Sequence, residues 1–422
     1  MSPTSNRRQI LAALAAMPLA SGLSACGRAG SRLDFWAMGN EAAALPALLD
    51  KVGGPLARKL TIQPLPWSSA HEKLLTGFAG GSLPTLSQIG NSWVAELAAI
   101  GAIEPVPARF ADLLDDQFAA VLDTNRIAGK TWAIPWYVDA RLQFYRKDLF
   151  ARAGYAAPPE RWAEWKAALH KVKALSGTGN YAVLMPVNEY EHLTGMALSA
   201  GASLLNAQGS RGAFRDERFV TALAFYKSLF DEGLAPLASA TQISNVWTEF
   251  ARGFFAVYPS GPWTIGDMQE RLPSGLADKW GTAPNPGPDG IGSAAPGGSS
   301  LVVFRGARDA ELGWKVISSL LARPAQVELQ RLTGDLPARI SAWNATGLAS
   351  APHTAPFLRQ LENARPVPKV PEWERIVSEM QVVAERMLRG EFTVVAAAAE
   401  MDRRADRLLA KRRWMLGQGR AL

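Results

Sequence analysis

Residues 133–150, AIPWYVDARLQFYRKDLF, hold two β-like runs on either side of a short polar break, followed by the start of a helix. The first run, 132–138, and the second, 142–145, contain the aromatic and β-branched residues that favour strands. The break between them contains Asp139, a carboxylate among apolar neighbours. Two strands and a helix in close succession are typical of a layered α/β protein.

The same alternation continues on both sides of this segment. Further strands are predicted over 33–37, 60–65, 85–89, 181–185, 254–258 and 301–304, and helices over 71–79, 160–175, 216–232, 310–321 and 373–388. The Gly- and Pro-rich stretch 284–300 is predicted to be a loop or a crossing between lobes. Because 422 residues exceed the roughly 250–300 that one hydrophobic core organises, we expect two lobes.

The composition and the motifs favour binding over catalysis. One cysteine excludes an internal disulfide and a Cys-based zinc site, and four scattered histidines argue against a metal site, so we expect no metal and no cofactor. The sequence contains no phosphate-binding P-loop, no G-x-G-x-x-G after a strand, no H-E-x-x-H and no G-x-S-x-G. We therefore expect no catalytic residues.

The first 26 residues have the pattern of an export signal. Arg7 and Arg8 precede an uncharged run over 10–22, which is shorter than the roughly 20 residues of a membrane-spanning helix. The paired arginines fit a twin-arginine signal or, equally simply, the general export route. The following Leu-Ser-Ala-Cys, 23–26, resembles a bacterial lipobox. We thus expect a signal peptide over 1–25 and lipidation at Cys26, the alternative being an incidental free thiol.

The net charge of +7 is concentrated at the two ends of the chain. The predicted signal carries two arginines and no acid, and residues 401–422 carry seven basic residues and two acids, so the remainder is neutral. This distribution does not indicate a nucleic-acid-binding groove. It fits a solvated helix end, where cations suit the helix dipole, or contact with anionic lipid headgroups.

Several further blocks accompany the opening segment, in which YRKDLF is followed by Gly154. They are FWAMGNE (35–41), HEKLLTGFAGGSLPT (71–85), QIGNSW (88–93), FARGFFAVY (250–258), GPW (261–263), GGSS (297–300), TGDLPAR (333–339) and Arg365-Pro366. In this order, covering nearly all of the chain after the signal, they resemble the family 1 extracellular solute-binding proteins of bacterial ABC importers, of the maltose/trehalose-binding type. One departure is Thr85, which stands where the family's turn has Asp.

This resemblance implies an α/β, two-lobe periplasmic-binding-protein fold with an interlobe ligand cleft and several hinge crossings. The crossings are expected near 137–141, 284–288 and 322–325. They would divide the chain into an N-lobe of 32–138 plus 285–322 and a C-lobe of 139–284 plus 323–422. The implied partners are a small sugar ligand and the transmembrane subunits of an ABC permease. The implied location is the periplasm or cell surface, as a lipid-anchored monomer that binds no nucleic acid.

A sugar site needs polar groups for the hydroxyls, and each polar candidate also has a simpler explanation. Glu41 could be a first-turn acid favoured by the helix dipole, Asn91 a turn residue, and His71 a solvated or capping group. Asp139 could form only an ion pair with Arg141. The candidates for contacts with hydroxyls are Glu41, His71, Asn91, Asp139 and, placed by the late turn of the family, Arg365.

The apolar faces of a sugar need flat rings, which a chain with 14 tryptophans can provide. Trp162 and Trp165 lie on a helical stripe and are expected in the core, whereas Trp93, Trp247 and Trp263 stand beside turns and are candidates for stacking. Tyr137 precedes Asp139 by two residues, so on a strand both face the same side. Gly297 and Gly298 would permit close approach of the backbone to a ligand, or form a plain flexible loop.

We expect the protein to bind a di- or oligosaccharide, with maltose- or trehalose-like α-glucosides favoured by the resemblance, and to break no bond. One alternative is the same fold with another small ligand, such as a phosphorylated polyol. The other is a lipid-anchored glycoside hydrolase that uses Glu41 and Asp139 as its acid pair.

Overall fold

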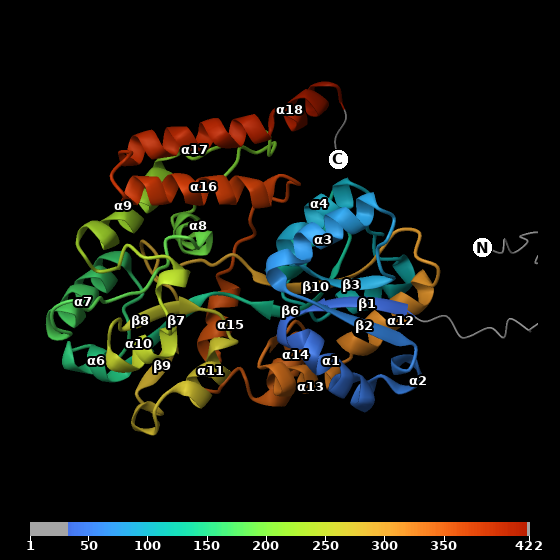
Figure 1. The fold of residues 1–422 in the computed structure, drawn as a ribbon, viewed down its shortest axis with the longest axis horizontal. Helices are drawn as coiled ribbons and strands as arrows, with labels where there is room; N and C mark the ends of the chain where they lie inside the picture. The colour runs from blue at the N-terminus through green and yellow to red at the C-terminus, as the bar shows by residue number, and fades with distance from the viewer. Residues whose placement is uncertain (1–32, 420–422) are drawn as a thin grey trace, which may run out of the picture.

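The computed structural model describes residues 33–419, which form two lobes lying side by side, each built on a β-sheet with helices around it (Figure 1). The strands of the first lobe are β1 (Leu33–Met38), β2 (Leu60–Leu65), β3 (Leu86–Gly90), β6 (Ile134–Asp139), β10 (Gly297–Val303) and β11 (Leu336–Pro337). They form one sheet in the order β11-β6-β10-β3-β1-β2. The predicted two-lobe α/β fold is confirmed. The predicted signal peptide and Cys26 lie outside the described residues.

Both faces of the first sheet are covered, which explains the nearly continuous apolar runs of its strands. The neighbours Phe35 and Trp36 of β1 point to opposite faces, and each is buried in a different apolar cluster. Strand β1 pairs parallel with β2 and β3, whereas β10 runs antiparallel between β3 and β6. A strand from late in the sequence thus completes the middle of this sheet.

Helices and one short hairpin surround the first sheet. They are α1 (Gly39–Val52), α2 (Gly54–Ala57), α3 (Trp67–Ala79), η1 (Asn91–Trp93), α4 (Val94–Ala99), η2 (Ala108–Leu114), α5 (Ala119–Thr124), β4 (Arg126–Ile127), β5 (Lys130–Thr131), α12 (Ala310–Leu321), α13 (Arg323–Thr333) and α14 (Ile340–Thr346). Helices α3 and α4 lie on one side of the sheet and α1, α12 and α13 on the other (Figure 1).

The expected crossing near 322–325, and with it the assignment of the residues after 322 to the C-lobe, is wrong. Helix α13 buries Ala325 and Leu329 in the same apolar cluster as α1. Strand β11 then pairs with β6 of the first sheet. The apolar face of α13 therefore has its core in the first lobe, and the chain leaves that lobe only after Pro337.

The second lobe holds a three-stranded antiparallel sheet with many helices. Its strands, in the order β8-β7-β9, are β7 (Leu142–Arg146), β8 (Val257–Ser260) and β9 (Trp280–Ala283). Its helices are α6 (Lys147–Arg152), α7 (Trp162–Leu175), α8 (Tyr190–Ser199), α9 (Glu217–Asp231), η3 (Ala240–Gln242), α10 (Val246–Arg252), α11 (Thr264–Arg271), η4 (Ser274–Leu276), α15 (Ala355–Glu362), α16 (Trp373–Leu388), α17 (Val394–Leu408) and α18 (Ala410–Gly417).

The strand predicted over 181–185 is wrong. This segment makes only a single bridge, between Val183 and Val257. Its other backbone hydrogen bonds go to different partners, since Tyr181 donates to the carbonyl of Phe254 and Ala182 to that of Leu234.

A shared apolar cluster joins the two lobes at their base. It contains Phe118 and Leu336 from the first lobe together with Phe144 and Trp280 from the second. The link from β6 to β7 passes through this cluster, so the crossing at Asp139–Leu142 is held at the bottom of the space between the lobes. Among residues 33–419, no helix has the length and apolar composition needed to cross a membrane.

Candidate functional site

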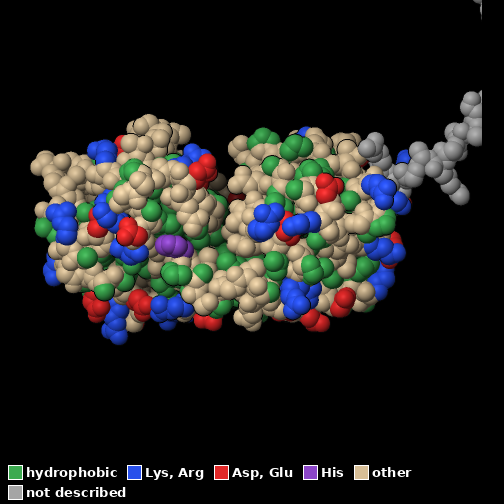
Figure 2. Space-filling view, turned by 90° about the horizontal axis from the view of Figure 1, so that it is seen from below, with side chains coloured by type: hydrophobic (Ala, Val, Ile, Leu, Met, Phe, Trp, Pro, Cys, Tyr) green, Lys and Arg blue, Asp and Glu red, His purple; other side chains and the backbone are tan. Residues whose placement is uncertain are grey.

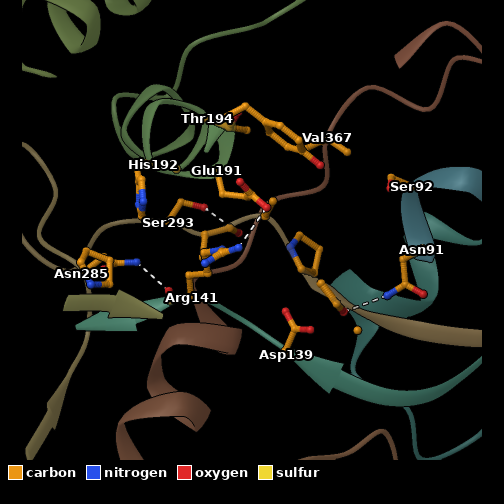
Figure 3. Close-up of a pocket in the computed structure, with 18 of the residues that line it drawn as sticks. Asn91, Ser92, Asp139, Arg141, Glu191, His192, Thr194, Asn285, Ser293 and Val367 are labelled. Carbon is orange, nitrogen blue, oxygen red and sulfur yellow. Dashed lines mark hydrogen bonds and ion pairs between the residues drawn. The ribbon is translucent and has the colours of Figure 1, made fainter. Parts of the chain in front are cut away.

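A cavity of about 590 Å³ lies between the two lobes, and both contribute to its walls. The first lobe supplies the ends of β6 and β3, the start of β10, and η1. The second lobe supplies α8, the start of α16 and Trp263, which directly precedes α11 (Thr264–Arg271). In Figure 3, Asn91 and Ser92 face Glu191 and Thr194 across this space, with Asp139 and Arg141 along one side. The volume falls in the range of about 300–1,000 Å³ that is typical of small-molecule sites.

Asp139 lies where the last residue of β6 pairs with the first residue of β10. A Cβ atom added to Gly297 would lie 2.0 Å from Asp139 Oδ1, and one added to Gly298 would lie 2.3 Å from the carbonyl oxygen of Tyr137. Gly298 also has a positive φ of 96°. The two glycines are therefore required for close packing of β10 on β6, and they leave the Asp139 carboxyl beside the cavity.

Burial raises the pKa of Asp139 to about 6, although the charge of Arg141 and a hydrogen bond from the Gly298 N–H act in the opposite direction. Because burial disfavours the ionised form of Asp139, any further hydrogen-bond donor that approaches the carboxylate stabilises it. A ligand hydroxyl in the cavity is such a donor.

Arg141 organises the second-lobe side of the cavity. Its guanidinium lies 3.2 Å from the Glu189 carboxylate and 3.0 Å from that of Glu191. The same guanidinium is 5.8 Å from the ring centre of Trp263, and the Arg141 carbonyl accepts a hydrogen bond of 2.6 Å from Asn285. The positive charge of Arg141 is thus paired with two carboxylates, so this side of the cavity does not favour an anionic ligand.

Asn91 and Ser92 of η1 both line the cavity. Asn91 Nδ2 donates to the carbonyl of Gly297 at 2.8 Å, and its Oδ1 accepts from Ser300 at 2.7 Å. The Asn91 side chain therefore ties η1 to β10 while lining the cavity. Ser92 lines the first-lobe side of the cavity and Glu374 the second-lobe side, where burial raises the pKa of the Glu374 carboxyl.

Aromatic rings form walls on both sides. Trp67 meets the ring of Trp93 edge-on at 5.6 Å in the first lobe, and Trp263 stands in the second. Trp67 and Trp263 are 36% and 37% exposed, which leaves ring surface free to stack on a ligand. The cavity thus combines flat apolar surfaces with carboxylate oxygens.

Seven of the residues predicted to contact ligand line this cavity, and four do not. The lining residues are Asn91, Trp93, Tyr137, Asp139, Trp263, Gly297 and Gly298. The four outside it are Glu41, His71, Trp247 and Arg365.

Glu41 lies beneath the cavity wall and is only 5% exposed. It lies close to Tyr137 and Asp335, and Glu41 Oε2 and Asp335 Oδ2 have no hydrogen-bond partner. Burial, reinforced by the Glu41 carboxylate, raises the pKa of both Tyr137 and Asp335. Glu41 therefore belongs to a buried group of acids that supports Tyr137 from behind.

The other three residues have structural roles or point elsewhere. His71 stacks on the outer side of Trp93 at 4.9 Å and pairs with Glu96 at 2.8 Å. Trp247 lines a separate cavity of about 350 Å³ next to Tyr258. Arg365 is exposed, and its backbone N–H donates to the carbonyl of Ala294.

Sequence reasoning missed several residues of the lining. They are Trp67, Tyr190, Glu191, His192, Lys369 and Glu374. A Trp directly after Pro66 at a helix start was a usable signal for Trp67, and the polar run Tyr190–His192 marked the start of α8. Nothing local distinguishes Glu374 from other acids in the first turn of a helix.

In the part of the chain that the structure describes, no cluster of three or more His, Cys, Asp and Glu side chains is arranged to hold a metal ion. The polar groups of the cavity are carboxylates, amides and hydroxyls, which suit hydrogen bonding to a ligand with many hydroxyl groups.

Residues 50–327 match the family described as bacterial extracellular solute-binding protein. The sugar-binding protein MalE of Xanthomonas citri has a solved structure that is 42% identical, with a TM-score of 0.87 over 92% of this chain and all of that one. A protein of Brucella abortus (strain 2308), named only as a binding protein, is 28% identical over 358 residues, 83% of this chain and 86% of its own. The diacetylchitobiose binding protein DasA of Streptomyces coelicolor is 22% identical over 74% of this chain and 73% of its own.

Proposed function

The chain belongs to the bacterial extracellular solute-binding protein family, and we propose that it captures a di- or oligosaccharide in the cavity between its lobes. Sugar-binding members of this family are exported components of ABC transporters and not enzymes, and this protein is one of them. The hydrolase alternative is therefore set aside. The finer proposal is that the ligand is a maltose- or trehalose-like α-glucoside, delivered to the membrane subunits of an importer.

The observation that carries this proposal is the pairing of rings and acids around one enclosed space. Trp67 and Trp93 on one lobe and Trp263 on the other offer faces for the C–H surfaces of sugar rings. Asp139 and Glu191 offer carboxylate oxygens to the hydroxyls. This division of roles suits a molecule with apolar faces and a polar rim.

The energies of such contacts are sufficient for tight binding. A hydrogen bond to a charged group contributes about 1.5–3 kcal/mol, and an aromatic stack contributes about 0.5–1.5 kcal/mol beyond area burial. Three of each give about 6–13 kcal/mol before the cost of ordering and closure. Burial of the apolar faces of the sugar adds to this sum, which brings the roughly 8 kcal/mol of a micromolar complex within reach.

The charges around the cavity favour an uncharged ligand over a phosphorylated polyol. The Arg141 guanidinium already contacts Glu189 and Glu191, and Lys369 Nζ lies 2.9 Å from Asp123. Asp139 and Glu374 add further acidic groups. A phosphate placed there would meet carboxylates whose cationic partners are already occupied.

A thermal-shift screen tests the proposed ligand class. Mono-, di- and oligosaccharides are compared with a sugar phosphate, each at the same high concentration. A ligand at about 100 times its Kd stabilises the protein by about 2.7 kcal/mol, so we expect a clear rise in Tm with α-linked glucosides. A rise with the sugar phosphate alone would refute the neutral-sugar proposal, and so would no rise with any carbohydrate.

The variant Trp263→Ala tests the site in this screen, and Trp247→Ala is its matched control. Trp263→Ala removes one wall of the cavity, whereas Trp247→Ala removes an indole from the separate cavity beside Tyr258. Only the first should reduce the sugar-induced shift. The same sugars should show no new reducing ends after incubation with the protein.

Lipid anchoring at Cys26 is part of this proposal. It is supported by the lipobox-like sequence before Cys26 and by its position directly after an apolar segment. Metabolic labelling with a radioactive fatty acid should mark the wild-type protein and not the Cys26→Ser variant. Equal labelling of both would refute the anchor.

A further inference from the structure

The C-terminal helix α18 projects from the second lobe with little covering it. Helix α17 buries five residues, including Met401 and Ala405, whereas α18 buries none. Leu409, with a ψ of 3°, separates the two helices, and the backbone N–H groups of Leu409 and Arg413 donate to Ala405 and Leu409 on either side of it. Figure 1 shows α17 and α18 as a bent rod along the top of the molecule.

The acids of this rod are already paired. Glu400 contacts Arg403 and Arg404, Asp402 contacts Arg215, and Asp406 lies 3.6 Å from both Arg211 and Arg413.

Other cations of the rod have no such partner. Within residues 33–419, no carboxylate lies within 4 Å of the charged groups of Arg407, Lys411 or Arg412. A net positive charge therefore remains on α18 and the end of α17. By contrast, basic and acidic side chains are interspersed on the opposite face of the molecule (Figure 2).

Arg407, Lys411 and Trp414 form what we call the basic stripe. Lys411 and Trp414 are three residues apart and share one face of α18, and Arg407 lies just before the bend at the end of α17. Arg407 and Lys411 are exposed. Trp414 is 59% exposed, more than Trp67 or Trp263 at the sugar cavity. A large indole so accessible to water, next to unpaired cations, is typical of surfaces that meet a lipid headgroup layer.

We propose that the basic stripe docks the protein on an anionic lipid surface. Arg407 and Lys411 would contact the phosphates of the headgroups, and the Trp414 ring would lie at the boundary with the acyl chains. None of the residues that line the sugar cavity comes from α17 or α18, so docking leaves that cavity free. The attraction is weak when it acts alone, and it would orient a protein already held at the membrane.

The first test measures binding of the full-length protein to vesicles of neutral phosphatidylcholine and to vesicles that also contain phosphatidylglycerol. We expect stronger binding to the anionic vesicles, and loss of this preference at 1 M salt, where charges are screened within about 3 Å. The double variant Arg407→Gln/Lys411→Gln should bind the anionic vesicles about thirtyfold more weakly, from the usual contribution of each cation.

The matched control is Arg58→Gln/Lys59→Gln, which removes two cations from the other lobe. Both side chains are exposed, and neither has an ion-pair partner among the described residues. All variants carry the same N-terminal segment, so any binding by that segment cancels in the comparison. Equal weakening by both double variants would overturn the proposal, because net charge alone would then explain binding. Unchanged binding of Arg407→Gln/Lys411→Gln would also overturn it and would leave a solvated helix end or a protein-binding face.

The second test asks whether Trp414 reaches the lipid. Anionic vesicles with brominated acyl chains should quench part of the tryptophan fluorescence of the wild-type protein, and Trp414→Phe should remove that part. Both proteins should keep their sugar-induced rise in Tm, which verifies folding. Identical quenching in both would refute a position of Trp414 at the acyl boundary.

Discussion

Replacing Asp139 by Asn should weaken sugar binding and at the same time stabilise the unliganded protein. Burial raises the pKa of this carboxyl from 3.8 to about 6. This difference corresponds to about 3 kcal/mol against the ionised form. Because the pKa is raised on folding, the cost is absent below pH 3.8 and complete above pH 6. Asp139→Asn avoids this cost and should gain up to about 3 kcal/mol of stability at pH 7.

The effect on sugar affinity has the opposite sign. An ionised acceptor forms a hydrogen bond worth about 1.5–3 kcal/mol, against about 0.5–1.5 kcal/mol for a neutral one. The Kd of Asp139→Asn at pH 7.5 should therefore rise about five- to tenfold. Wild-type affinity should fall as the pH drops through 6, because the carboxylate takes up a proton, whereas the affinity of the variant should change much less.

Titration calorimetry at pH 5 and 7.5, with thermal unfolding in the same buffers, measures both effects. Asp34→Asn is the control, since Asp34 is exposed on β1, away from the cavity, and its replacement should change neither quantity. If Asp139→Asn bound the sugar as tightly as the wild-type protein at both pH values, the carboxylate would not contact the sugar. A lower Tm of the unliganded variant would refute the account of its burial.

The remaining predictions concern three other positions. Trp263→Ala should raise the sugar Kd about threefold to tenfold, from the loss of a stacking ring, while Trp247→Ala leaves the Kd unchanged in the same calorimetry. Gly298→Ala should destabilise the protein by more than about 1 kcal/mol in urea titration, because its Cβ would lie 2.3 Å from the Tyr137 carbonyl oxygen; an unaltered midpoint would contradict this. Asp335→Asn should stabilise the unliganded protein at pH 7, since burial raises the pKa of Asp335. The gain should shrink as the pH falls toward 4, and a gain independent of pH would argue against this cause.

Strong local patterns made parts of the fold predictable from sequence. The helices predicted over 310–321 and 373–388 have these bounds in the structure, because both carry a continuous apolar face. Gly297–Ser300 was predicted to be loop from its glycines, yet it opens β10. Pairing with β6 on one side and β3 on the other outweighs the weak strand preference of glycine.

The site was predictable where its residues lie at strand ends within recognisable blocks, as Asn91 and Asp139 do. It was not predictable for Glu191 and Glu374, which stand far apart in sequence and meet only because α8 and α16 pack side by side in the second lobe. Trp247 and Trp263 both stand beside turns, and the sequence alone does not show which of them lines the cavity. Trp263 reaches the cavity because it directly precedes α11 and lies next to Arg141, whereas Trp247 packs near Tyr258. Only the fold distinguishes the two positions.

The position of β10 has a consequence for the protein during its synthesis. The strands on either side of β10 leave the ribosome long before β10 itself, so the growing chain carries two unpaired strand edges while the second lobe is still being translated. Pairings so distant along the chain form slowly. A newly made copy should therefore stay unfolded and open to chaperones until its last third has emerged.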